Sequence, residues 1–108
     1  QIYGGGLQGV GYALGEKMVY VNGELENGNF LDYKIPTAKD VPPMQAVIVE
    51  TDEKDGPFGA KGIGEPGLVP TAPAIANAIY DAVGVRIKDL PITPEKVLKA
   101  LKGKEKIG

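Results

Sequence analysis

The sequence contains no cysteine and no histidine among its 108 residues. Without cysteine, the chain holds no disulfide and no cysteine-ligated zinc or iron–sulfur centre. Without histidine, it has no imidazole base, no serine–histidine nucleophile and no histidine metal ligand. No apolar run approaches the roughly 18–20 residues that a membrane-spanning helix requires, and no basic-then-apolar leader is present. We therefore expect a cytoplasmic protein with no membrane partner.

Aromatic residues and net charge are also scarce. Aromatic side chains make up 6% of the chain and the formal net charge is −2, with the basic residues scattered. Nucleic-acid binding normally needs a basic face and aromatic stacking platforms, so we expect no nucleic-acid partner. The hydrophobic fraction of 43% predicts a globular chain, and its length predicts a single domain over residues 1–108 with a small core.

Glycine and proline, in contrast, are abundant, with 16 and 9 residues. The glycines have no regular period, so a collagen-like chain is excluded, and many tight turns are expected. Apolar spacing predicts a helix over residues 7–18, whose glycines weaken it by about 1 kcal/mol each unless another segment approaches closely. Asn22-Gly23 predicts a type I′ hairpin over residues 19–26. Residues 30–36 are predicted to be extended, and residues 46–49 to form a short buried strand.

The second half of the chain alternates loop and helix. Five glycines and three prolines between Asp52 and Pro70 predict a long irregular loop of the kind that is often functional. A helix over residues 72–83 should follow, with Thr71 as its cap and Gly84 as its stop. Thr93-Pro94 should start another helix, ended by Gly103, and residues 102–106 should be a solvated tail. These elements predict an α+β fold with short strands, a hairpin and about three helices.

Two stretches fit the dinucleotide-binding pattern G-x-G-x-x-G: Gly4, Gly6 and Gly9, and then Gly62, Gly64 and Gly67. The true fingerprint follows a strand and opens a helix. The first stretch has no strand before it, and prolines on both sides of Gly67 oppose a helix in the second. A dinucleotide-binding fold is therefore disfavoured.

Glu65 is the single acid in the loop Gly59-Ala60-Lys61-Gly62-Ile63-Gly64-Glu65-Pro66-Gly67. Flanking glycines would let the backbone pack closely around this carboxylate, which could then act as a general base. Composition alone favours the simpler reading of a solvated loop glutamate. Gln1 and Gln8 could hydrogen-bond a polar ligand beside the glycine backbone, but glutamines at a frayed chain end are the more ordinary interpretation.

Four blocks change this balance, and they cover residues 1–9, 30–37, 59–66 and 70–79. In order and approximate spacing they resemble the xanthine dehydrogenase/aldehyde oxidase family of molybdenum hydroxylases, in the C-terminal part of the molybdopterin-binding large subunit. The resemblance runs over nearly the whole chain. The family subunit is much longer, and the chain opens abruptly at Gln1, so we expect a fragment. Tyr3 departs from the glutamate that relatives often carry, which leaves its local contacts open.

The resemblance implies a cofactor and a mechanism. In the family, a pyranopterin (molybdopterin or its dinucleotide form) holds molybdenum through dithiolene sulfurs, and iron–sulfur and flavin centres lie in other regions or subunits. A loop glutamate takes a proton from the molybdenum-bound hydroxide, the oxygen attacks a C–H carbon, and hydride passes to a sulfido ligand. Glu65 holds that glutamate's place, and Gln1, Gly4, Gly5 and Gly64 are the implied cofactor-binding residues. No residue of this chain is expected to bind the metal directly.

The sequence thus predicts part of a molybdenum-dependent hydroxylase that oxidises an N-heterocycle or an aldehyde with water as the oxygen donor. The expected partners are the rest of the subunit, iron–sulfur and FAD subunits, and a small-molecule substrate. The isolated chain should be inactive and could self-associate through surface that normally packs on the subunit. Two alternatives stay open: a non-catalytic assembly subunit or gene remnant, and a free-standing small-molecule binding domain.

Overall fold

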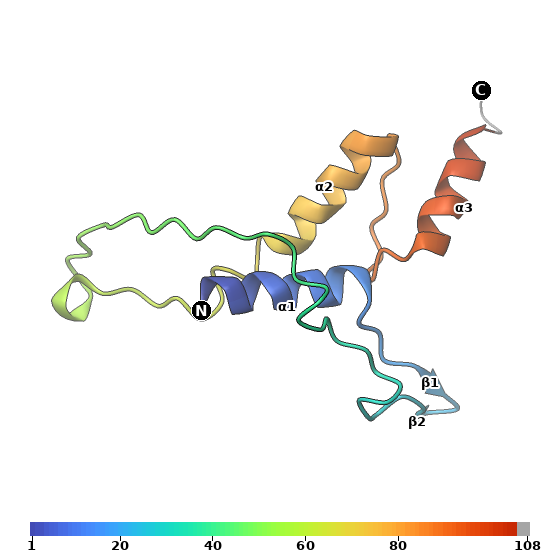
Figure 1. The fold of residues 1–108 in the computed structure, drawn as a ribbon, viewed down its shortest axis with the longest axis horizontal. Coiled ribbons are helices and arrows are strands. Elements are labelled where there is room, and N and C mark those ends of the chain that lie inside the picture. The colour runs from blue at the N-terminus through green and yellow to red at the C-terminus, as the bar shows by residue number, and fades with distance from the viewer. Residues whose placement is uncertain (106–108) are drawn as a thin grey trace.

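The computed structural model describes residues 1–105, in which three helices and one hairpin are joined by long irregular segments (Figure 1). The elements in chain order are α1 (Ile2–Leu14), β1 (Tyr20–Val21), β2 (Glu24–Leu25), the 3₁₀ turn η1 (Pro57–Gly59), α2 (Thr71–Val83) and α3 (Pro94–Glu105). The predicted combination of about three helices with a short antiparallel hairpin is therefore confirmed.

The molecule is more extended than its length requires. Its radius of gyration is 17.8 Å and its dimensions are 56 × 40 × 28 Å, whereas a compact domain of this length has a radius of gyration of about 13 Å. Much of the excess comes from residues 47–63, hereafter the arm, which run outward past the N-terminus and back again (Figure 1). The arm is irregular except for η1, which confirms the predicted long loop and extends it toward the N-terminus.

Helix α1 differs from the predicted helix at both ends. It begins at Ile2 rather than Leu7, and it ends at Leu14 rather than Met18. Both Gly15 and Glu16 donate their backbone N–H to the Gly11 carbonyl, at 2.9 and 2.8 Å, and this turn ends the helix. The early start shows that tertiary packing outweighs the poor helix propensity of three consecutive glycines.

The glycines of α1 do bring other segments close to its backbone, as predicted. A Cβ atom added at Gly9 would lie 2.5 Å from the Thr71 Cβ, so α1 and α2 cross where a side chain is missing. A Cβ atom added at Gly6 would lie 2.7 Å from the Met44 Cε. A larger residue at Gly9 would push α2 away, because it would meet the Cβ of Thr71, whereas one at Gly6 would meet only the terminal methyl group of the flexible Met44 side chain.

The hairpin is confirmed in its turn and register. Val21 pairs with Glu24, and both turn residues have the positive φ that a type I′ turn needs, 51° at Asn22 and 87° at Gly23. The Asn27 side chain closes the base of the hairpin, because it accepts from the Val19 N–H at 2.8 Å and donates to the Lys17 carbonyl at 2.7 Å.

The prediction that residues 30–36 are extended is wrong for the first half of this segment. The Asn29 side chain accepts from the Leu31 N–H at 2.9 Å, and the Asn29 carbonyl accepts from the Tyr33 N–H at 2.8 Å. These bonds fold residues 29–33 into a turn, since an asparagine side chain readily replaces a backbone acceptor. The Tyr33 hydroxyl then donates to the Glu16 carboxylate at 2.7 Å and ties this turn to the end of α1.

The predicted start and stop signals of α2 and α3 are confirmed only in part. Gly84 ends α2 with a left-handed φ of 67°, as predicted. Thr71 does not cap α2, because it is the first helical residue and its hydroxyl donates to the Gly67 carbonyl at 3.0 Å. Helix α3 continues through Gly103 to Glu105, so Gly103 does not end it, and residues 102–105, predicted as a solvated tail, belong to the helix, in which Lys102 and Gly103 are exposed. Lys106, the last residue of the predicted tail, lies outside the described residues.

The buried strand predicted over residues 46–49 is wrong for this chain. These residues form no regular structure, and Val47, Ile48 and Val49 are 72%, 78% and 78% exposed. The apolar signal in the sequence was real, but no other part of the described chain covers this segment.

The core is small, as expected from the length. Its buried hydrophobic side chains in the described part of the chain are Ala13, Ala72, Val85 and Ile92. The Ile92 N–H donates to the Ala13 carbonyl at 2.7 Å, which fixes the segment before α3 against α1. Over residues 1–105, no helix combines the length and apolar character that crossing a bilayer requires.

Candidate functional site

Glu65 sits at the start of a tight turn. Its carbonyl accepts from the Leu68 N–H at 2.8 Å and from the Val69 N–H at 3.1 Å. Two hydrogen bonds to one carbonyl fix the backbone directly after Glu65, and Pro66 restricts it further. The turn leads immediately into α2, which begins at Thr71.

The Glu65 turn packs directly on the first turn of α1, and glycine makes this possible from both sides. A Cβ atom added at Gly5 would lie 3.2 Å from backbone atoms of Gly67 and Leu68. A Cβ atom added at Gly67 would lie 3.1 Å from the Ile2 carbonyl oxygen. The two glycine-rich stretches, some sixty residues apart in sequence, are therefore in backbone contact here, and neither is a dinucleotide fingerprint.

The predicted cofactor-binding residues gather around this contact. Gln1 precedes α1, and its carbonyl accepts from the Gly5 N–H at 2.9 Å, whereas its side chain makes no capping bond and is exposed. Gly4 and Gly64 are exposed, and no atom lies within 4 Å of a Cβ added to either. The structure thus brings Gln1, Gly4, Gly5 and the Glu65 turn to one end of α1, whereas Gly64, directly before Glu65 in the sequence, is exposed and contacts none of them.

The electrostatics of this end suit anionic and polar groups. The first N–H groups of a helix have no partner within the helix, and together they carry a partial positive charge. They lie beside the exposed amide of Gln1, which can both donate and accept hydrogen bonds. Glu65 adds a carboxylate that is exposed in this chain, so its shielding from water would have to come from another part of the protein or from a ligand.

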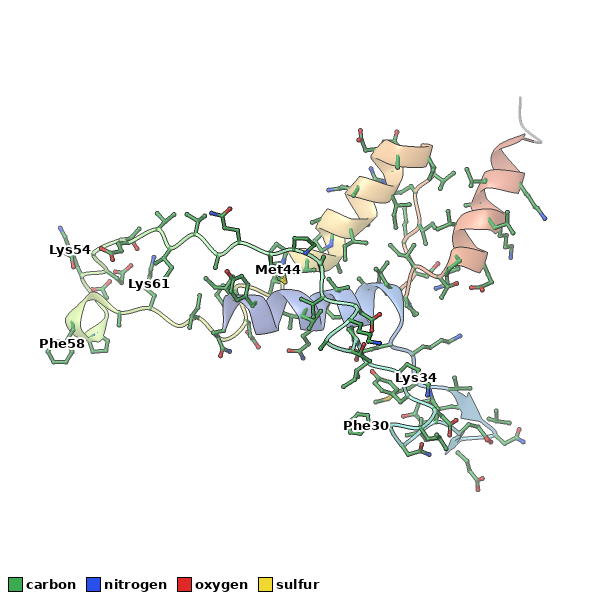
Figure 2. All side chains as sticks on the ribbon, viewed as in Figure 1. Phe30, Lys34, Met44, Lys54, Phe58 and Lys61 are labelled. Atoms are coloured by element: carbon green, nitrogen blue, oxygen red, sulfur yellow. The ribbon has the colours of Figure 1, made fainter. Side chains whose placement is uncertain are left out.

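An open hollow of about 880 Å³ lies between the two legs of the arm. Its lining is formed by Val49, Glu50, Thr51, Asp52, Phe58, Gly59, Lys61, Gly62, Ile63 and Pro66. Phe58 and Lys61 extend from the returning leg, far from the body of the molecule (Figure 2). The hollow reaches Pro66, next to Glu65 in the sequence, and it connects the arm with the Glu65 turn.

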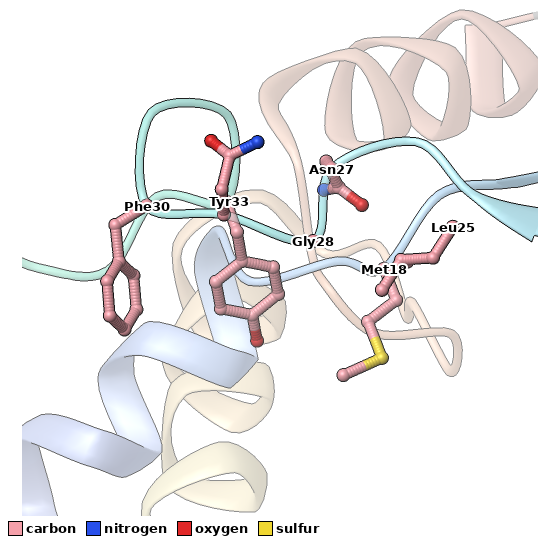
Figure 3. Close-up of a pocket in the computed structure, with 7 residues that line it drawn as sticks. Met18, Leu25, Asn27, Gly28, Phe30 and Tyr33 are labelled. Carbon is pink, nitrogen blue, oxygen red and sulfur yellow. The ribbon is translucent and has the colours of Figure 1, made fainter.

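A second, more apolar pocket lies at the opposite end of α1, beside the hairpin (Figure 3). It encloses about 210 Å³ and is lined by Met18, Leu25, Asn27, Gly28, Asn29, Phe30 and Tyr33. The polar groups of Asn27 and Tyr33 are already hydrogen-bonded within the chain. This pocket offers no titratable group free for chemistry, so the Glu65 end of α1 is the better candidate site.

Sequence reasoning missed two features of this region. The glycine pattern includes Gly67 but does not indicate that the Glu65 turn contacts α1 through this residue. Sequence reasoning also passed over Phe58, which is fully exposed and has a positive φ of 53°. The neighbouring Pro57 and Gly59 mark a turn there, but only coordinates show which residue takes the left-handed conformation.

Among residues 1–105, no group of three or more histidine, cysteine, aspartate or glutamate side chains is placed to hold a metal ion. The polar groups at this end of α1 are instead the Gln1 amide and the first backbone N–H groups of the helix.

Comparison with known proteins defines the class of protein to which this arrangement belongs. Residues 1–42 match the family described as a molybdopterin cofactor-binding domain, and they include Gln1, Gly4 and Gly5. The chain is 42% identical over 99 residues to the xanthine dehydrogenase molybdenum-binding subunit of Escherichia coli O157:H7, which covers 90% of this chain and 13% of that protein. It is 43% identical over 107 residues to the nicotine 6-hydroxylase large subunit of Paenarthrobacter nicotinovorans, covering 95% of this chain and 13% of that protein.

A solved structure gives the same result. The chain superposes on quinoline 2-oxidoreductase from Pseudomonas putida 86 with a TM-score of 0.83 and 33% identity, covering 94% of this chain and 13% of that one. The class is therefore that of molybdenum-cofactor-binding subunits. Within this class the chain belongs to the xanthine dehydrogenase/aldehyde oxidase family, as a piece of its molybdenum-binding subunit. It spans only about 13% of the relatives it matches.

Proposed function

We propose that the N-terminal end of α1 and the Glu65 turn form one wall of a molybdenum-cofactor site, in which Glu65 is the general base of a hydroxylation reaction. The observation that supports this proposal is the contact between Gly5 and Gly67, which packs the turn that begins at Glu65 against the first turn of α1. The substrate would be an N-heterocycle or an aldehyde, with water as the source of oxygen. The site would belong to a larger cytoplasmic assembly with iron–sulfur and FAD subunits.

The residues present fit a pyranopterin cofactor in their chemistry. Gln1 offers both a donor and an acceptor, as the polar edge of a pterin requires. The first N–H groups of α1 suit a phosphate, and the open space beside Gly4 and Gly64 allows a flat group to approach the backbone. When bound, the cofactor would supply oxygen transfer and take up two electrons from the substrate.

The chain's own residues would then have two tasks. Glu65 would take a proton onto a carboxylate oxygen from the oxygen nucleophile as it attacks the substrate carbon. Gly5 and Gly67 would keep the Glu65 turn in place, because a displacement of about 1 Å at a reacting group can lower a rate about a hundredfold. The isolated chain would be inactive, since Glu65 is exposed and the other walls of the site are missing.

The different reactions named in the relatives explain why the substrate is left as a class. Their names refer to xanthine and nicotine, and that of the solved structure to quinoline. The stretch shared with this chain is similar in all three, so it suits a catalytic function common to several substrates better than the selection of one.

The decisive experiment replaces Glu65 by glutamine in the assembled enzyme that contains this chain. Glutamine keeps the size of the side chain but cannot take up the proton, so reduction of the enzyme by substrate should slow at least about a hundredfold. Molybdenum content, measured by elemental mass spectrometry, should stay near one atom per chain.

Glu24→Gln is the matched control, because Glu24 is an exposed glutamate in β2, at the other end of α1. It should leave both the rate and the molybdenum content unchanged. Near wild-type turnover in Glu65→Gln would refute the role of Glu65. A chain purified from its native cells without molybdenum and without a partner would instead favour an assembly piece or gene remnant.

A further inference from the structure

Residues 46–50 have a composition that does not match their surroundings. Val47, Ile48 and Val49 are β-branched residues that favour strands, yet each is more than 70% exposed. Side chains alternate between the two faces of an extended segment, so Val47 and Val49 share one face and Ile48 lies on the other. Both faces are therefore apolar over residues 46–49, and Glu50, on the same face as Ile48, is the one charged residue of the segment. A strand with one face in water would carry polar residues at alternate positions.

The backbone of this segment is equally without partners. In the part of the chain that the structure describes, the Ala46 N–H donates to the Tyr3 hydroxyl at 3.2 Å, and residues 47–50 make no backbone hydrogen bond. Buried peptide groups are almost always paired. Apolar side chains on both faces favour burial of this segment. Once it is buried, its N–H and C=O groups need hydrogen-bond partners, which a strand on each side would provide.

We propose that residues 46–50 form a central strand of a β-sheet that the remaining part of the molybdenum-binding subunit completes. The segment would be hydrogen-bonded along both edges and covered on both faces. This inference rests on the family assignment and does not depend on the catalytic role of Glu65.

The remainder of the subunit is the partner that the comparisons favour. The superposition on quinoline 2-oxidoreductase covers 94% of this chain but 13% of that one, so a segment of this shape exists within a chain several times longer. A second copy of this chain fits less well, because its own residues 46–50 could pair along one edge only, and its described strands β1 and β2 have two residues each. Neither is long enough to pair with five residues.

The proposed strand also affects the candidate site. Its residues Val49 and Glu50 line one side of the hollow whose other side includes Ile63 and Pro66. The outgoing leg of the arm is fixed at its base, where Met44 lies against Gly6 and Ala46 is bonded to Tyr3. Pairing of residues 46–50 would fix that leg further out and so hold one wall of the hollow that leads to the Glu65 turn.

Hydrogen–deuterium exchange at single-residue resolution, on the intact subunit that contains this chain, tests the proposal. The amides of Val47, Ile48, Val49 and Glu50 should all exchange at least about a hundredfold more slowly than in an unstructured chain. The amides of Lys54 and Asp55, at the tip of the arm, provide an internal reference and should exchange fast.

Three results would overturn the proposal. Fast exchange at all four positions would show that no sheet forms. Protection at alternate positions alone would identify an edge strand, which pairs on one side. Protection that disappears when the subunit is diluted to a monomer would assign the pairing to a second copy.

Substitution tests the burial of both faces. Val47→Asp and Ile48→Asp place a carboxylate on opposite faces, and each should raise the exchange rates of the neighbouring arm amides at least about tenfold, because an unpaired charge is costly to bury. Lys88→Asp, at an exposed position between α2 and α3, is the control and should not change them. An effect of Val47→Asp with none of Ile48→Asp would refute burial of both faces. If either variant fails to fold, the exchange of the unmodified subunit remains decisive.

Discussion

Two regions of this chain, the surroundings of α1 and the arm, differ in how their residues are packed. Around α1, the chain brings backbones together through glycine, so that the Glu65 turn, α2 and Met44 all approach one helix without intervening side chains. In the arm, the chain carries large apolar side chains and leaves them exposed, with Val47, Ile48, Val49 and Phe58 among them. The backbone contacts of the first region are all made within the chain. The second has the composition of a core whose other half lies elsewhere.

The comparison shows that exposure in a piece of a protein must be interpreted together with its sequence. Exposed apolar residues scattered over a surface are ordinary. A run of three β-branched residues without backbone partners is not, because both its side chains and its peptide groups lack what a folded protein normally provides. Substitutions in the two regions should therefore have different consequences.

The largest expected effect is that of Gly9→Val in the packed region. Its Cβ would lie 2.5 Å from the Thr71 Cβ, so α1 and α2 must separate, at a cost of about 3 kcal/mol. In the intact subunit, the amides of α1 should then exchange about a hundredfold faster. Gly62→Val, in the arm, adds the same side chain where no atom lies within 4 Å of the Cβ, and α1 exchange should be unaffected. If both variants accelerated the exchange of the α1 amides equally, the distinction between the packed region and the arm would be refuted.

A smaller effect is expected for Gly5→Ala, which tests whether the packed region positions the Glu65 turn. The added Cβ would lie 3.2 Å from backbone atoms of Gly67 and Leu68, so the turn must move by a few tenths of an ångström. We expect turnover to fall about tenfold with molybdenum retained, since rates are sensitive to small displacements of a reacting group. Gly15→Ala, with its nearest neighbour at an ordinary 3.8 Å, should leave turnover unchanged. Unchanged turnover in Gly5→Ala would remove the positional role of this contact.

The smallest effect concerns the link between α1 and the turn at residues 29–33. The hydrogen bond to Glu16 raises the pKa of Tyr33 above its ordinary value of 10.0, with burial and the charge of Glu16 as lesser causes. A raised pKa means that the protonated tyrosine stabilises the fold, fully below about pH 10 and decreasingly as the pH rises through the folded-state value. Tyr33→Phe should lower the protection of the amides of residues 29–33 against hydrogen exchange at neutral pH, relative to an unstructured chain at the same pH. The further loss of protection that the unmodified chain shows in alkali should be absent from this variant. If this variant still lost protection at residues 29–33 as the pH rises, another group would be responsible for the titration.

Local signals in the sequence predicted several elements correctly. Asn22-Gly23 predicted the type I′ turn because both residues tolerate a positive φ. Gly84 predicted the end of α2 for the same reason. Gly103 shows the limit of such signals, since a glycine with space around it can also stay within a helix, as it does in α3. The Glu65 loop was recognised from its ordered family blocks rather than from its spacing alone.

By itself, the sequence determined the Asn22-Gly23 turn, the approximate positions of the three helices and the family, because these depend on residues close together in the chain or on whole blocks of residues. Only the tertiary structure decided that α1 starts at Ile2, that Gly5 meets Gly67 and that Gln1 and Glu65 share one end of a helix. These facts depend on contacts between distant segments, whose close approach no local preference encodes. The exposure of residues 46–49 belongs to the same class, because whether a strand is buried is decided by the segments that cover it.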